Sequence, residues 1–231
     1  MTRIEVLTDT AFAFAFTMLV ISLNELPRSW DALAESLKQL PALLASFMQI
    51  MLFWYGHVKW SRRFGLEDVT TVWLSGALIF VMLVFVYLLR LLFSSAFAWL
   101  TGGWLPPEIT IDGLAGVRGL FLLYGAGFFL LSALLMLLNA HALRLRSELA
   151  LSALEVHATR GEIQAMVVFA GTAAVSMLFA AVLDGGWLAL AGMVYGTLGF
   201  SMPAIAIRHD RRKPPDNAAE AGGLYESRDH G

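Results

Sequence analysis

The sequence lacks cysteine and is poor in charged residues. None of its 231 residues is cysteine, so disulfide bonds, thiolate nucleophiles and cysteine-ligated metals are excluded. Charged residues make up 15% of the chain, against about 25% in soluble globular domains, whereas 58% of the residues are hydrophobic. The net charge of -2 provides no basic field for nucleic acid. This composition excludes a soluble enzyme, a disordered protein and a secreted disulfide scaffold, and predicts an integral membrane protein.

What the sequence has instead is a series of long apolar runs. A helix needs about 20 mostly apolar residues to cross the roughly 30 Å of hydrocarbon in a bilayer. Six runs satisfy this requirement: residues 6–23, 41–60, 72–92, 114–138, 163–183 and 187–207. They lack the sustained alternation of membrane β-strands. The sequence therefore predicts an all-α membrane protein with six transmembrane helices.

The basic residues predict how these helices are oriented, because lysine and arginine collect on the cytoplasmic side of a membrane. Three of the 16 basic residues flank one set of helix ends (Arg28, Lys38 and Arg118), and Arg90 lies inside the third run. The other twelve flank the opposite ends: Arg3, Lys59, Arg62, Arg63, Arg144, Arg146, Arg160, Arg208, Arg211, Arg212, Lys213 and Arg228. Both termini are therefore expected in the cytoplasm, with residues 1–208 forming the membrane domain and residues 209–231 a disordered tail.

Some segments between and within the runs carry further expectations. Residues 30–40 are typical of an amphipathic helix leading into the second run, and residues 143–162 form either a helical hairpin or extensions of the fourth and fifth helices. Arg90 is expected to extend outward to the membrane surface. The first run is not expected to be a signal peptide, since Glu5 and Asp9 are acidic where such a peptide is basic.

Polar residues at the cytoplasmic ends of the first two helices form a second feature. Arg3 and Asp9 belong to the first helix, and Trp54 and His57 lie at the same depth on the second. Buried polar groups in membrane bundles commonly hold helices together. The alternative is that Asp9 and His57 titrate and control gating or relay protons.

One face of the first helix carries a mixed pattern. Phe14, Thr17, Met18 and Ile21 have the spacing i, i+3, i+4 and i+7, which places them on one side of a helix. An apolar face with one hydroxyl is compatible with a pore lining and equally with a packing ridge. Composition alone does not separate the two.

Sequence signatures of catalysis and metal binding are absent. The five histidines lack metal-ligand spacing, and no nucleophile elbow or phosphate-binding loop occurs. We therefore expect no enzymatic activity, no cofactor and no metal site.

The first two helices resemble a known family. The segment Arg3-x-x-x-Leu7-Thr8-Asp9, with Phe12-Ala13 and Thr17-Met18-Leu19-Val20 after it, is similar to the RxxxFSD signature of the transmembrane protein 175 family. Ser46-Phe47 and Phe53-Trp54-x-x-His57 are similar to that family's SF…FWxxH pattern. The family contains the lysosomal potassium channel of animals and bacterial homologues with a single six-helix unit. The similarity covers roughly the first 90 residues.

The resemblance implies a potassium channel whose pore is lined by the first helix of each subunit. Phe14 takes the place of the isoleucine that forms the constriction, and Thr17 that of a threonine that contributes to selectivity. Met18 and Ile21 take the places of further apolar layers. Arg3, Asp9, Trp54 and His57 match a polar network that fixes the first helix against the second. A homotetramer in the cell membrane, with potassium ions and the lipid bilayer as its partners, is what the resemblance implies.

This sequence departs from the family pattern at the constriction. Phe14 is larger and flatter than isoleucine, so it narrows or closes the pore, or offers an aromatic face to a cation. A proton or unselective cation leak channel and a non-transporting membrane scaffold therefore remain as alternatives to a potassium channel.

Overall fold

The computed structural model describes residues 2–21, 29–109, 111 and 113–211. Within these residues the regular structure is helical, and six stretches are long and apolar enough to cross a membrane, which confirms the predicted all-α membrane fold. The elements are α1 (Arg3–Ile21), α2 (Trp30–Leu37), α3 (Leu40–Phe64), α4 (Val69–Leu100), α5 (Gly113–Arg144), α6 (Ala153–Val182), η1 (Gly185–Ala189), α7 (Leu190–Met193), η2 (Val194–Thr197) and α8 (Leu198–Asp210).

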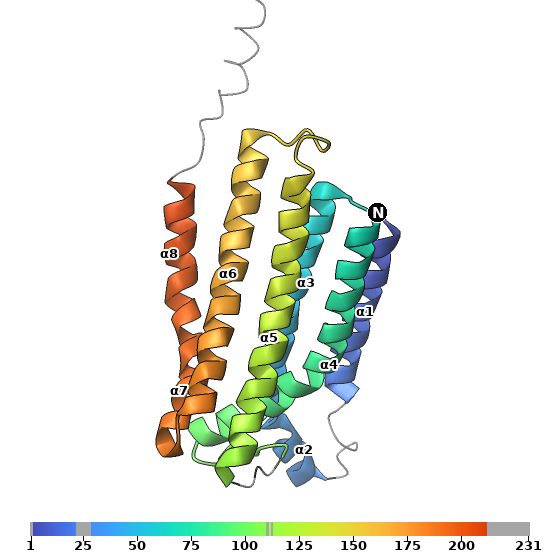
Figure 1. The fold of residues 1–231 in the computed structure, drawn as a ribbon. Helices are drawn as coiled ribbons and strands as arrows, with labels where there is room; N and C mark the ends of the chain where they lie inside the picture. Colours follow the sequence, from blue (N-terminus) through green and yellow to red (C-terminus); the bar gives the residue numbers. More distant parts are fainter. Residues whose placement is uncertain (1, 22–28, 110, 112, 212–231) are drawn as a thin grey trace, which may run out of the picture.

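The helices form one bundle with the chain passing up and down through it (Figure 1). The N-terminus and the last turn of α8 lie at the same end, which we call the terminal end, and α2 lies at the opposite end, which we call the loop end. In this view α1 and α8 occupy opposite edges. α1 packs against α3 and α4. The 32 residues of α4 are about 48 Å long at 1.5 Å per residue, so this helix extends beyond the hydrocarbon layer.

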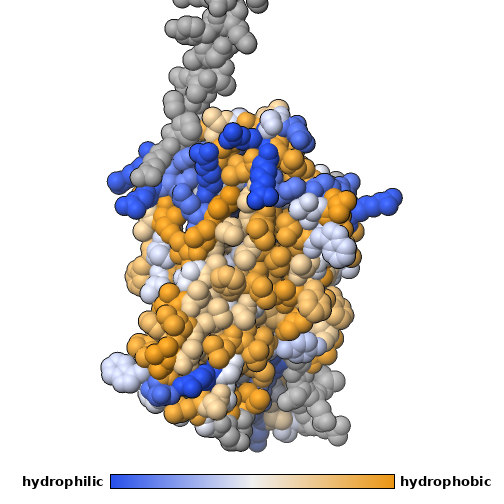
Figure 2. Space-filling model, in the orientation of Figure 1, coloured by the Kyte–Doolittle hydropathy of each residue, from blue (hydrophilic) through white to orange (hydrophobic). Residues whose placement is uncertain are grey.

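The surface follows the same division. Hydrophilic side chains gather at the terminal end, and the middle of the bundle is mainly hydrophobic (Figure 2). Exposed apolar side chains are normal where the surroundings are lipid rather than water. Both ends of the described chain lie on the side where most basic residues were counted, in agreement with the predicted cytoplasmic orientation. Arg28 lies outside the described residues, and so does the predicted tail except for residues 209–211. Of these, His209 and Asp210 belong to α8 rather than to a disordered tail.

Aromatic rings fill the centre of the bundle. Phe128 of α5 lies 5.3 Å from Phe53 of α3, 5.6 Å from Phe169 of α6 and 5.4 Å from Tyr195 of η2, between ring centroids. Phe85 of α4 reaches the same cluster through an edge contact with Phe53. Edge-to-face and tilted ring pairs of this kind stabilise a fold by more than the burial of their apolar area alone. The cluster therefore joins the second, third, fourth and fifth long helices and the last one.

A short turn connects α3 to α4 at the terminal end. Gly65 ends α3 with a positive φ of 56°, and its N–H donates to the carbonyl of Ser61. Asp68 then caps α4: it accepts a hydrogen bond from the Thr70 N–H and one from the Thr71 hydroxyl. His141 of α5 lies 2.9 Å from the same carboxylate. Burial raises the pKa of Asp68, but the Thr71 hydrogen bond and the charge and hydrogen bond of His141 outweigh it, so the pKa is lowered.

Replacing Asp68 by alanine is expected to cost about 1 kcal/mol of stability at neutral pH, the usual value for a lost N-cap. Because the pKa of Asp68 is lowered in the folded state, its contribution is complete above the ordinary value and is lost as the pH falls through the lowered value. The difference in melting temperature between the wild type and Asp68→Ala should therefore shrink in acid. Asp31→Ala, at an exposed position on α2, is the control. A pH-independent difference would contradict this account.

The last span is less regular than the others. From Gly185 to Asp210 the chain stays helical, with 3₁₀ turns at η1 and η2. The rings of His157 on α6 and His209 on α8 stack 3.8 Å apart, and each Nε2 lies 3.0 Å from the other residue's carbonyl oxygen. Gly161 permits this approach, because a Cβ there would lie 2.6 Å from Nε2 of His209. The end of α8 is thus attached to α6.

Two predictions about connecting segments can be judged. The amphipathic helix expected at residues 30–40 is α2, which ends at Leu37 before α3 begins. For residues 143–162, the extension is correct and the hairpin is not: α5 continues to Arg144 and α6 begins at Ala153. Ser152 and Glu155 form a capping box that starts α6, which explains why the helix begins there.

Candidate functional site

The first helix has one side that no other part of the described chain covers. Phe12, Ala15 and Leu19 are buried against the bundle, at 1%, 0% and 2% exposure. On the opposite side of α1, exposed residues recur every three or four positions along the whole helix. We call them the exposed stripe of α1: Arg3, Val6, Leu7, Thr10, Ala13, Phe14, Thr17, Val20 and Ile21.

Three of the four residues predicted to line a pore lie on this stripe. Phe14 is 54% exposed, Ile21 is 68% exposed, and Thr17 is also exposed. Met18 is half-buried at the edge of the stripe and lines a small cavity with α4. The structure thus groups Phe14, Thr17 and Ile21 and turns Met18 partly toward the bundle.

Two threonine hydroxyls lie along the stripe, one heptad apart. The Thr17 hydroxyl donates to the carbonyl of Ala13 at 2.9 Å, and the Thr10 hydroxyl donates to that of Val6 at 2.8 Å. With its proton used in this way, each hydroxyl oxygen keeps lone pairs free to accept. The sequence prediction named Thr17 and omitted Thr10, although the seven-residue spacing was available as a signal. Oxygen acceptors of this kind suit a cation.

Asp9 and Trp54, from the predicted polar network, are in contact. The Trp54 indole N–H donates to the Asp9 carboxylate at 3.0 Å, which connects α1 to α3 across the bundle interior. A hydrogen bond to a charged acceptor contributes about 1.5–3 kcal/mol. This bond orients α1 near its terminal end.

The other two members of that network make no hydrogen bond to Asp9 or Trp54 within the described residues. His57 is buried at 1% exposure, and its Nε2 lies 3.3 Å from the Ser75 hydroxyl of α4. The Arg3 side chain is exposed and makes no hydrogen bond or ion pair within the described residues; its backbone N–H donates to Glu67. The structure therefore divides the predicted network into an α1–α3 bond and an α3–α4 contact.

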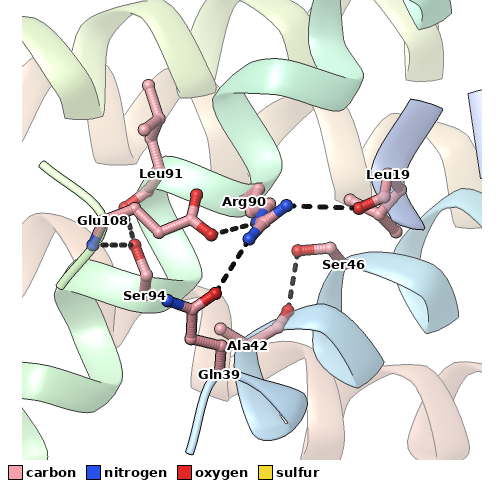
Figure 3. Close-up of polar contacts among 8 residues, drawn as sticks. All are labelled: Leu19, Gln39, Ala42, Ser46, Arg90, Leu91, Ser94 and Glu108. Atoms are coloured by element: carbon pink, nitrogen blue, oxygen red, sulfur yellow. Dashed lines mark hydrogen bonds and ion pairs between the residues drawn. The ribbon is translucent and has the colours of Figure 1, made fainter. Parts of the chain in front are cut away.

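Arg90 does not extend outward to the membrane surface, and that expectation was wrong. It is 4% exposed and forms an ion pair with Glu108, as Figure 3 shows. Its guanidinium also donates to the Gln39 side chain at 3.1 Å and to the carbonyl of Leu19 at 3.4 Å. The reason is that α4 continues past Arg90 to Leu100, and the segment after α4 folds back and covers it.

The surroundings of Glu108 are poorly hydrated. Burial raises the pKa of this carboxyl above its ordinary value, and the charge and hydrogen bond of Arg90 offset the rise only in part. No group of three or more histidine, cysteine, aspartate or glutamate residues in the described part of the chain is arranged to hold a metal ion. Arg90, Glu108, Gln39 and Ser94 thus pair with one another and with backbone groups.

Comparison with known proteins gives two sequence matches. Residues 3–87 match the family model described as endosomal/lysosomal potassium channel TMEM175. A protein of Marivirga tractuosa named potassium channel is 30% identical over 182 residues, which cover 77% of this chain and 73% of that protein. The chain belongs to the TMEM175 family. The resemblance inferred from the first two helices is thereby confirmed.

A solved member of the TMEM175 family has the same fold. The crystal structure of a single-residue variant of the potassium channel MtTMEM175, in complex with a nanobody–MBP fusion protein, aligns with a TM-score of 0.76 and 25% identity. The alignment covers 92% of this chain and 94% of that one. This TMEM175 protein is therefore a multi-pass membrane protein of a potassium channel family, and its relatives carry the name of a transport class rather than of an enzyme class.

The family model ends before the Arg90 cluster. It matches through residue 87, so Arg90 and Glu108 lie beyond the matched residues. Sequence reasoning noticed Arg90 as a charge inside a span but did not identify its partner. A carboxylate 18 positions away in a loop carries no local signal that it pairs with that arginine.

Proposed function

We propose that four copies of this chain form a potassium-permeable channel in the cell membrane, with a pore lined by α1. The observation that carries the proposal is the exposed stripe of α1, which leaves Phe14, Thr17 and Ile21 without cover in a single chain. One helix does not enclose a pore, so the channel requires copies around a symmetry axis, and cyclic rings are the common way to close one. The resemblance of the first two helices implies four copies, and the relatives named potassium channel support potassium as the ion.

Ion flow in this proposal is passive and crosses a hydrophobic neck at Phe14. A constriction of apolar side chains controls flow by filling with water or emptying. Thr17, one turn further along, offers hydroxyl oxygens that replace part of the ion's hydration shell. Ile21 forms a further apolar layer, and Met18 contributes at the edge of the stripe.

The polar residues near the terminal end have a positioning role in this mechanism. The bond from Trp54 to Asp9 fixes the direction of α1 relative to α3, and His57 supports α3 from inside the bundle. Arg3 belongs to the same exposed stripe and lies at the terminal end of the proposed pore. The terminal end of a pore-lining helix requires a defined orientation, because a rotation there would exchange the residues that face the ion.

The test is potassium flux from liposomes that contain the purified protein, with sodium and proton gradients as parallel measurements. Flux that favours potassium is the expected result. Unselective cation flux or proton flux would keep the channel and overturn the selectivity. A folded tetramer that carries no ion under any gradient would favour a non-transporting scaffold and overturn the proposal.

A further inference from the structure

Arg90 is a buried charge that the channel mechanism described above does not use. A charge at the edge of the hydrocarbon layer is costly unless it is paired. Here the guanidinium contacts three segments other than its own helix: the end of α1 through Leu19, the start of α3 through Gln39, and the segment after α4 through Glu108 (Figure 3). Its position therefore connects four parts of the fold at the loop end.

The contact with α1 is made to a backbone carbonyl near the end of this helix. Leu19 lies two residues before Ile21, the last residue of α1. A positive charge is also favourable at this end of a helix, where the backbone dipoles leave partial negative charge. Arg90 thus acts as a cap on α1, supplied by α4.

The backbone after α4 holds Glu108 against Arg90. Gly102 and Gly103 have positive φ angles of 63° and 88°, which end α4 and turn the chain back along it. The N–H of Glu108 then donates to the Ser94 hydroxyl at 3.3 Å. Arg90 is consequently held by Leu19 and Gln39 and, from the segment after α4, by Glu108. The ion pair between Arg90 and Glu108 is mostly buried from water.

A cavity adjoins this cap. It has a volume of about 110 Å³ and lies between α1 and α4. Its lining includes Met18 and Leu19 of α1, together with Arg90 and Glu108. A closely packed interior resists small displacements, and Leu19 is buried at 2% exposure. The polar cap therefore acts together with apolar packing to hold this end of α1.

We propose that Arg90, held by Glu108, is a positioning residue that fixes the loop end of α1 and thereby sets the fraction of time for which the pore is open. This inference rests on the proposed function, because it requires that α1 lines the pore. It assigns no contact with the ion to Arg90. Unitary conductance and ion preference should therefore stay unchanged when the cap is weakened.

The experiment is single-channel recording of the full-length protein in planar bilayers, on Arg90→Gln, Glu108→Gln and the double variant. Each single substitution should change the open fraction about fivefold or more, the range typical of coupling between distant sites. The double variant should resemble Arg90→Gln alone, since Arg90→Gln already removes the ion pair that Glu108→Gln disrupts. Arg118→Gln is the matched control, because Arg118 forms an ion pair with Asp184 away from α1. It should leave the open fraction unchanged.

The conservative variant Glu108→Gln and one further variant, Arg90→Lys, keep the outcome decisive. Glu108→Gln preserves the shape of the side chain, so it is expected to fold even if Arg90→Gln does not. Arg90→Lys keeps the charge but loses the planar geometry that reaches several acceptors, and it should restore the open fraction in part. An open fraction equal to the wild type in Glu108→Gln, or independent effects in the double variant, would overturn the proposal.

The failure of this inference is distinguishable from the failure of the proposed function. If Phe14→Ala changes unitary conductance while the Arg90 and Glu108 variants leave the open fraction unchanged, α1 lines the pore and the cap does not control it. If the wild type carries no current at all and no flux occurs in liposomes, the proposed function fails and this inference fails with it.

Discussion

Replacing Phe14 by alanine is expected to raise the unitary potassium conductance about tenfold, the change that follows from a barrier lowered by about 1.4 kcal/mol. Phe14 is 54% exposed on the stripe of α1 that the proposed pore requires. In the proposed tetramer, its removal from each copy widens the neck and shortens the apolar stretch that excludes water. Discrimination between potassium and sodium should weaken at the same time, since ions would pass with more of their hydration shell.

The control for this prediction is Phe80→Ala, the same substitution on α4. Phe80 is 70% exposed but lies on a different helix, so its loss should leave conductance and selectivity unchanged. Single-channel conductance and reversal potentials under mixed potassium and sodium solutions provide the measurement. Equal behaviour of Phe14→Ala and the wild type in both would mean that the exposed stripe of α1 faces lipid or a neighbouring subunit rather than ions.

Replacing Phe53 by alanine is expected to cause the largest loss of stability. This ring is 1% exposed and makes edge contacts with Phe85 and Phe128, at 6.5 and 5.3 Å between centroids. Because lipid is as apolar as the core, transfer of the ring contributes little in a membrane, and lost packing dominates. A cavity of roughly 100 Å³ at about 24 cal/mol per Å³ gives a loss of about 2.4 kcal/mol.

The melting temperature of the purified protein in detergent, followed by size-exclusion chromatography after heating, measures this loss. Phe80→Ala again serves as the control, since an exposed substitution normally changes stability by less than about 0.5 kcal/mol. If the two variants melt at the same temperature, the aromatic cluster does not hold the helices together. A lower melting temperature with normal selectivity would separate this core role from the proposed role of Phe14.

The sequence was sufficient to predict features that depend on local composition. The six spans follow from the length of apolar runs and the thickness of a bilayer, and each run coincides with one of the six helical stretches long enough to cross a membrane. The hydrogen bond between Asp9 and Trp54 was predictable, since both residues lie at the same depth on consecutive membrane spans. The family followed from motifs confined to the first two helices.

The environment of Arg90 was not predictable in this way. Glu108 contacts the guanidinium only because the chain turns back after Leu100. Gln39 contacts it from the start of a different helix. Charge and hydropathy favoured an arginine that extends toward water, because a span taken alone contains no partner for it. The tertiary structure supplied the partners.

The sequence by itself determined that this protein crosses the membrane with six helices, because hydropathy and charge act on each segment separately. It left open which side of α1 is covered, since Phe12 and Phe14 are equally apolar and two positions apart. Only the packing of α3 and α4 decided that Phe12 is buried and Phe14 is free. The physical reason is that the side of a helix that becomes buried depends on the shapes of the helices packed against it. The sequence of one segment does not contain that information.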